Sequence, residues 1–236
     1  MLAPLAALVD RALELVKWPT GIAAALLLPP SIQAAWLLVK RVLAEPAPIA
    51  AFAIGLALYF VVWQLVLRER IFGSFFAVLE HELTHVLFAL ATLHPVTGFR
   101  ATFYAGGHVR WQGRGNWLIY VSPYFFPTAC VAIIAVAALV PDAWRWWADA
   151  LLGAATAYHI TSTMQETHGG QTDLAHVGFT FSLLFLPTAN LLALGIVVAF
   201  SHDGLPGLHQ FFGDVASGAG AYLRLAPDAW LNRGRT

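Results

Sequence analysis

Residues 81–85 read His-Glu-Leu-Thr-His, and this is the pattern in the chain with the clearest chemical meaning. In a helix, His81 and His85 lie on one face about one turn apart, which is the spacing that two ligands of one zinc ion need. Glu82 lies between them and points to the side, where its carboxylate can act on an attacking water rather than on the metal. The pattern predicts zinc bound by His81 and His85, with Glu82 as a catalytic general base.

The motif lies inside an apolar stretch, which changes how it is interpreted. Apolar residues dominate positions 71–79 before it and 86–91 after it. A chance match on a soluble amphipathic helix would have a polar face to support it, and this segment has none. Ionisable groups in such surroundings are costly and usually functional. Glu80 lies about 100° around a helix from His81, so we expect it to face another helix and not the metal.

The composition is that of a membrane protein. Of the 236 residues, 59% are hydrophobic and only 11% are charged, whereas soluble domains carry about 25% charged residues. Mean hydropathy is +0.69. The formal net charge is zero, so nothing points to nucleic acid as a partner. The single cysteine, Cys130, cannot form an internal disulfide, and the sequence does not indicate an oligomeric state.

Apolar stretches of about 20 residues are long enough to cross a bilayer, and the chain has several. We predict an all-α polytopic membrane protein with five or six transmembrane helices. The five predicted spans are 46–67, 71–93, 117–140, 144–166 and 174–201. A sixth apolar stretch, 18–39, is interrupted by Pro29 and Pro30, so it is either a broken span or a re-entrant hairpin.

We predict one membrane-embedded domain over residues 1–236. Its parts are an N-terminal interfacial and broken apolar segment (1–45), a catalytic helix bundle (46–201) and an amphipathic C-terminal tail (202–236). Both amphipathic ends could instead pack against the bundle.

Residues 99–111, directly after the motif segment, read as two short strands around Gly106 and Gly107. One interpretation is a connecting hairpin without a further role. The functional interpretation is an exposed strand edge that pairs with an extended peptide. On that interpretation the substrate-binding residues are Thr102, Gly106, Gly107 and His108.

A catalytic zinc has three protein ligands and one open position, so a third ligand must come from another helix. Asp173, His159 and Glu166 are the candidates, with His168 and His176 nearby. Asp173 could instead begin a helix as a capping residue, and His159 could be a hydrogen-bonded histidine of the bundle. The spacing alone does not choose among them.

The motif at 81–85, the hairpin with Gly106 and Gly107, and the downstream Asp173 together resemble the site-2 protease family of intramembrane zinc metalloproteases. The resemblance is to its small single-domain members and covers roughly residues 71–190. It implies that the third ligand is Asp173, that the site faces the cytosol and that a strand beside the motif helix holds the substrate. The family's aspartate stands in Asn-Pro-x-x-x-Leu-Asp-Gly, whereas here the context is Gln-Thr-Asp-Leu.

Basic residues near the ends of the predicted spans suggest an orientation. We assign the hairpin to the side reached by the end of the motif segment. Cytoplasmic loops carry an excess of Lys and Arg, which favours the hairpin side as cytoplasmic in a cell (inner) membrane. The hairpin side is assigned Lys40, Arg41, Arg100, Arg110 and Arg114, and the other side Arg68, Arg70 and Arg145.

These features predict a zinc-dependent metalloendopeptidase that hydrolyses a peptide bond within or next to the transmembrane segment of a single-span membrane protein. Two other classes stay open. One is a zinc-binding membrane sensor or scaffold without protease activity, which would not need Glu82. The other is a metal or proton transporter, which would spread polar residues across the whole membrane depth.

Overall fold

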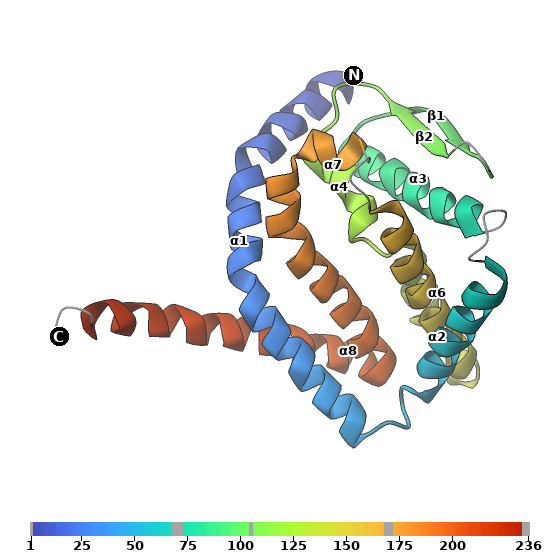
Figure 1. Cartoon of the computed structure of the whole chain (residues 1–236), viewed down its shortest axis with the longest axis vertical. Helices are drawn as coiled ribbons and strands as arrows, with labels where there is room; N and C mark the ends of the chain where they lie inside the picture. Colours follow the sequence, from blue (N-terminus) through green and yellow to red (C-terminus); the bar gives the residue numbers. More distant parts are fainter. Residues whose placement is uncertain (1, 68–72, 104–105, 168–171, 233–236) are drawn as a thin grey trace.

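The computed structural model of the chain is mostly helical, with one two-stranded antiparallel sheet (Figure 1). It describes residues 2–67, 73–103, 106–167 and 172–232. The longer helices are α1 (Leu2–Ala44), α2 (Ala50–Val62), α3 (Gly73–Ala91), α5 (Thr128–Ala137), α6 (Arg145–Glu166) and α8 (Phe179–Asn232). The shorter elements are η1 (Trp63–Leu67), β1 (Val96–Ala101), β2 (Gly107–Trp111), α4 (Trp117–Val121), η2 (Ser122–Tyr124), η3 (Asp142–Trp144) and α7 (Thr172–Val177).

Two pairs of long helices form the frame of the molecule. α1 packs along α8, and α2 packs along α6. The second pair is very close, because glycines meet the facing backbone. A Cβ added at Gly55 would lie 1.8 Å from the carbonyl oxygen of Ala150, and one at Gly153 would lie 1.9 Å from that of Phe52. Small residues of this kind let membrane helices approach each other closely.

The motif helix α3 slants across one half of the molecule and does not run parallel to α6 and α8 (Figure 1). That half also holds the N-terminal end of α1, the hairpin, α4 and α7. α3 packs on α6, on both strands and on α4 and η2. Because of this placement, the motif side chains face several elements that come from distant parts of the sequence.

α1 is one continuous helix of 43 residues with Pro19, Pro29 and Pro30 inside it. Pro29 and Pro30 therefore do not interrupt the apolar segment 18–39, and residues 2–17 continue into it rather than forming a separate interfacial helix. The helix is among those long and apolar enough to cross a membrane, as the span interpretation of 18–39 requires. A proline removes one backbone hydrogen bond from a helix, but packing on both sides can outweigh that loss. α1 is supported along its length by α8, and Pro30 is fully buried beside Gly218 of the C-terminal helical segment.

The span predicted at 117–140 is not one continuous helix. It is made of α4 with η2, followed by α5, and the two parts are bent by 77°. Pro123 lies in η2 and Pro127 directly precedes α5, so the missing N–H groups interrupt the helix there. The bend places the end of α4 and η2 against α3.

Three helices within the described ranges are long and apolar enough to cross a membrane, and the bent pair would make a fourth. They are Ala3–Ala44, Ala50–Leu67 and Phe179–Arg224. Neither α3 nor α6 is among them, so the count of five or six spans is not confirmed. Both of these helices carry buried polar side chains that face each other, which lowers their mean hydropathy.

The C-terminal segment begins at a kink in α8, where Asp203 and Gly204 have non-helical backbone angles. Gly204 has a φ of 60°, a conformation that glycine adopts readily. After the kink the helix crosses α1, where Phe211 is buried and Asp214 pairs with Arg41 at 2.7 Å (Figure 1). The part of the predicted amphipathic tail up to Gly218 therefore packs on α1, and the rest of the described helix extends beyond the bundle (Figure 1).

Lys40 and Arg41 lie at the end of the bundle opposite the hairpin, contrary to the side assigned from the sequence. The first turns of α1 contact the hairpin end, where Asp10 meets His94. About 30 residues of helix, or about 45 Å, separate Asp10 from Lys40. The assignment failed because it assumed that every apolar stretch crosses the membrane in turn, whereas α3 stays in one half of the molecule.

Candidate metal centre

The two motif histidines and Asp173 converge on one point. The Nε2 atoms of His81 and His85 lie 3.1 Å apart. The Oδ2 atom of Asp173 lies 3.3 Å from the first and 3.2 Å from the second. These three atoms form the one group within the described residues that could hold a metal ion. The grouping predicted for Asp173 from the family resemblance is therefore present.

The triangle has the dimensions that zinc requires. Zinc binds histidine nitrogen and carboxylate oxygen at about 2.0–2.1 Å, so two ligand atoms of a tetrahedral site lie about 3.3–3.4 Å apart. The observed separations of 3.1–3.3 Å come within a few tenths of an ångström of that value. Bound to these three atoms, a tetrahedral ion would keep its fourth position open, as catalytic zinc sites do.

His85 is held in the orientation that a ligand needs. Its Nδ1 lies 2.8 Å from the carbonyl oxygen of Ile119 in α4. A carbonyl oxygen can only accept, so Nδ1 carries the proton and the lone pair of Nε2 faces the triangle. The ring of Tyr124 packs edge-on against His81, with the ring centroids 5.3 Å apart. Residue patterns could not reveal the role of Ile119, because it acts through its backbone.

Asp173 lies in the first turn of α7, and its side chain points toward the histidines. Burial favours the neutral acid, but the imidazole side chains of His81 and His85 beside it outweigh burial and hold the pKa of Asp173 well below its ordinary value. The carboxylate is therefore ionised, which is the form that binds a metal.

Glu82 lines the same cavity as the triangle but is not one of its three ligands. The cavity measures about 310 Å³. The carboxyl side chain of Glu82 is almost fully buried. A carboxylate beside the metal position that does not bind it is placed as a general base should be. The cavity is lined by Val78, His81, Glu82, His85, Gly106, Gly107, His108, Val109, Trp111, Glu166, Thr172 and Asp173.

The other candidates for the third ligand do not belong to the three-atom group. His159 is buried in α6, where its Nδ1 lies 3.9 Å from Glu80 and not beside the motif histidines. Glu166 lines the metal cavity but is outside the three-atom group. His176 packs on Tyr120, and His168 is outside the described residues.

Glu80 faces α5 and α6, as predicted. Its carboxylate accepts the backbone N–H of Ala129 at 3.2 Å and the hydroxyl of Ser162 at 3.5 Å. The sequence suggested that Glu80 turns away from the metal but did not identify these partners. They explain how a buried carboxylate is tolerated so near the motif.

The hairpin lies directly on the motif helix. A Cβ added at Gly107 would lie 2.6 Å from Cγ of Glu82 and 2.7 Å from Cγ1 of Val78, so only glycine fits there without displacing Glu82. Gly106, Gly107 and His108 line the metal cavity, as the substrate-binding prediction requires.

Thr102 has a different place from the one predicted. Its backbone N–H and its hydroxyl both donate to the carbonyl oxygen of Gly106, at 3.1 and 2.6 Å. It is not among the residues that line the metal cavity. Thr102 therefore closes the turn, and the prediction missed this because the sequence does not show which backbone groups pair across a hairpin.

The pairing pattern also identifies the backbone groups on the outer edge of β2. Arg100 is opposite His108 and Phe99 is opposite Val109. Hydrogen-bonded and non-hydrogen-bonded residue pairs alternate along an antiparallel sheet. The backbone hydrogen bond from Thr102 to Gly106 shows which of the pairs are the hydrogen-bonded ones. The backbone groups of Gly107, Val109 and Trp111 therefore point outward from β2, along the strand that lines the metal cavity.

No protein-family model matches this chain, and neither a curated protein nor a solved structure matches it. The resemblance to site-2 proteases thus rests on the motif, the hairpin and Asp173.

Proposed function

We propose that this protein is a membrane-embedded zinc metalloendopeptidase that cleaves a peptide bond within or next to the transmembrane segment of a single-span membrane protein. The observation that carries the proposal is the triangle formed by Nε2 of His81, Nε2 of His85 and Oδ2 of Asp173. Its edges suit zinc with one open position, and Glu82 lines the same cavity.

Bound zinc supplies Lewis acidity, which polarises the scissile carbonyl and makes a water more acidic. Glu82 takes the proton of the attacking water and returns it to the nitrogen of the leaving amine. The isosteric amide of a glutamine cannot accept this proton. His85 keeps its orientation through Ile119, so the three ligands are in place before substrate arrives.

The substrate must be extended at the cleavage site, because a transmembrane helix keeps its carbonyl groups in internal hydrogen bonds. The outward backbone groups of Gly107, Val109 and Trp111 can pair with such a segment. An added strand on this edge would run along the wall of the metal cavity. We therefore assign substrate binding to the edge of β2, with Gly106 and His108 beside it.

The apolar helices support placement in a bilayer. Hairpin residues line the cavity, and the hairpin lies at one end of the bundle (Figure 1), so we assign cleavage to a position near one membrane surface. Among the described residues near the two ends, more basic side chains lie at the hairpin end, which favours that end as cytoplasmic. The hairpin end has Arg11, Lys17, Arg100, Arg110 and Arg114, and the opposite end has Lys40, Arg41 and Arg145.

The test is purification in detergent, measurement of bound metal, and incubation with a panel of single-span substrates reconstituted in vesicles. We expect one zinc per chain and cleavage that Glu82→Gln abolishes while the zinc is kept. Bound zinc without cleavage of any substrate would favour a sensor or scaffold. A protein that binds no zinc at His81 and His85 would overturn the proposal.

A further inference from the structure

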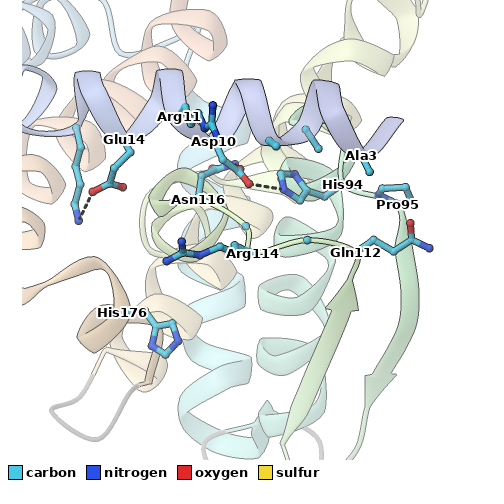
Figure 2. A pocket seen from close by; sticks show the side chains of 15 residues that line it. Ala3, Asp10, Arg11, Glu14, His94, Pro95, Gln112, Arg114, Asn116 and His176 are labelled. Carbon is cyan, nitrogen blue, oxygen red and sulfur yellow. Dashed lines mark hydrogen bonds and ion pairs between the residues drawn. The ribbon is translucent and has the colours of Figure 1, made fainter. Parts of the chain in front are cut away.

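A second polar cavity, of about 670 Å³, lies between the first turns of α1 and the loop that precedes α4 (Figure 2). Its wall includes Asp10 of α1, His94 from the end of the motif segment and Asn116 from the loop. Figure 2 shows the carboxylate of Asp10 between His94 and Asn116. This cluster is outside the metal centre, and the chemistry proposed above does not use it.

Asp10 holds both neighbours by hydrogen bonds. One carboxylate oxygen lies 3.2 Å from Nε2 of His94, and the other accepts Nδ2 of Asn116 at 2.9 Å. His94 is completely buried and Asn116 is nearly so. A carboxylate only accepts, so the contact requires the amide of Asn116 to present its NH2 group to Asp10. The contact with Asp10 therefore also fixes the orientation of the side-chain oxygen of Asn116.

The oxygen of Asn116 caps α4. It accepts the backbone N–H of Ile119 at 3.3 Å, which satisfies one of the free donors in the first turn of the helix. The carbonyl oxygen of the same Ile119 accepts Nδ1 of His85 at 2.8 Å. The hydrogen bonds therefore run without interruption from Asp10 through Asn116 and Ile119 to His85.

α4 has only five residues, so it depends on its contacts for its position. Besides the cap, Nε1 of Trp117 donates to the carbonyl oxygen of Leu13 in α1 at 2.8 Å. The helix that orients His85 is thus tied twice to the N-terminal helix. A shift of α4 would move the Ile119 carbonyl and turn the imidazole away from the triangle.

From this arrangement we infer that Asp10 is a positioning residue for the metal centre, acting through the Asn116 cap and the Ile119 carbonyl on His85. The inference rests on the proposed metal site. It gives the first turns of α1 a role in metal binding that the motif sequence does not contain.

The experiment measures zinc affinity by competition with a chelator and the absorption spectrum of the cobalt-substituted protein. Groups that contact a metal ligand directly contribute about 10–100-fold to affinity. Asp10 acts two steps further away, through Asn116 and the Ile119 carbonyl, so Asp10→Ala, which removes the acceptor for the Asn116 NH2, should weaken zinc binding about 3–10-fold. The cobalt spectrum should change with it, because the ligand geometry changes. A variant that only lowered folding stability would leave the spectrum of the folded protein unchanged.

Exchanging the two residue types between positions 10 and 116 gives a sharper test. Asn116→Asp keeps the cap oxygen but places a second carboxylate against Asp10, so we expect weaker zinc binding than in the wild type. The double variant Asp10→Asn with Asn116→Asp again places an amide donor opposite a carboxylate acceptor. Its zinc affinity and cobalt spectrum should therefore return to those of the wild type. Even if one single variant fails to fold, the double variant still tests the series of hydrogen bonds from Asp10 to His85.

The matched control is Glu14→Gln, an acidic residue one turn further along α1 that lines the same cavity. Glu14 pairs with Lys17 at 3.9 Å rather than with the cap of α4, so zinc affinity should be unchanged. Wild-type affinity and spectrum in Asp10→Ala, or no recovery in the double variant relative to Asn116→Asp, would overturn the inference. Failure of the wild type itself to bind zinc would instead overturn the metal site.

Discussion

The two faces of α3 carry similar residues with different consequences. On one face His81 and His85 meet Asp173, with ligand atoms 3.1–3.3 Å apart beside a cavity of about 310 Å³. On the other face Glu80 meets His159 at 3.9 Å. The first group points three lone-pair atoms at one position. In the second group, the carboxylate of Glu80 accepts hydrogen bonds from α5 and α6, so its oxygen atoms already have partners within the protein.

The comparison shows that residue type alone does not make a metal centre. Both faces have buried histidine and carboxylate side chains. What differs is convergence, since a zinc ion needs three atoms at the corners of one tetrahedral face and an open fourth position. The polar group around Glu80 instead joins α3 to α5 and α6, and we interpret it as support for the motif helix.

The largest effect is expected from His81→Ala. Removing one of three ligands should abolish stoichiometric zinc binding, whereas His159→Ala on α6 should keep one zinc per chain. Metal analysis of both purified variants checks this. Full zinc in His81→Ala, or loss of zinc in folded His159→Ala, would reverse the roles that we assign to the two faces.

The next effect separates the two glutamates. Glu82→Gln should keep zinc but lower the cleavage rate by about 10²–10⁴-fold, the usual contribution of a general base. Glu80→Gln, the same substitution two residues away on the other face, should retain most of the activity because the new amide still offers an oxygen to the Ala129 N–H. Single-turnover cleavage in detergent measures both. Similar rates for the two variants would contradict the assignment of Glu82 as the base.

A smaller effect is expected at the strand that borders the metal cavity. Val109→Pro removes an outward N–H from the outer edge of β2, so strand addition by the substrate should weaken and turnover should fall about tenfold for a loss of about 1.4 kcal/mol. Val109→Ala keeps that N–H and should stay near the wild-type rate. Zinc content should be unchanged in both. If the two variants cleave equally well, the hairpin is a connection and the substrate is held elsewhere.

The smallest effect on chemistry is expected from Glu80→Ala, which acts on stability. It leaves the Ala129 N–H without its buried partner, so the free energy of unfolding should fall by about 1–3 kcal/mol. Unfolding in mixed detergent measures that change, and zinc content per folded chain should stay at one. A loss of zinc from the folded fraction would make Glu80 part of the metal centre.

Much of the fold could be predicted from local patterns. Apolar stretches indicated the helical, membrane-compatible architecture, and the Gly106-Gly107 pair indicated the hairpin. The predictions failed where packing outweighed local preference. Pro29 and Pro30 do not break α1, because α8 supports it, whereas Pro123 and Pro127 do bend the segment predicted as a span at 117–140.

The sequence by itself determined the motif of His81, Glu82 and His85, because the helical period of 3.6 residues puts both histidines on one face whatever the rest of the chain does. The spacing of residues could not choose Asp173 over His159, and the tertiary structure does, since the choice depends on which distant elements approach α3. The same holds for Ile119 and Asn116, which act through a backbone carbonyl and a helix cap. Contacts made by backbone groups leave no mark on residue type, so folding alone decides them.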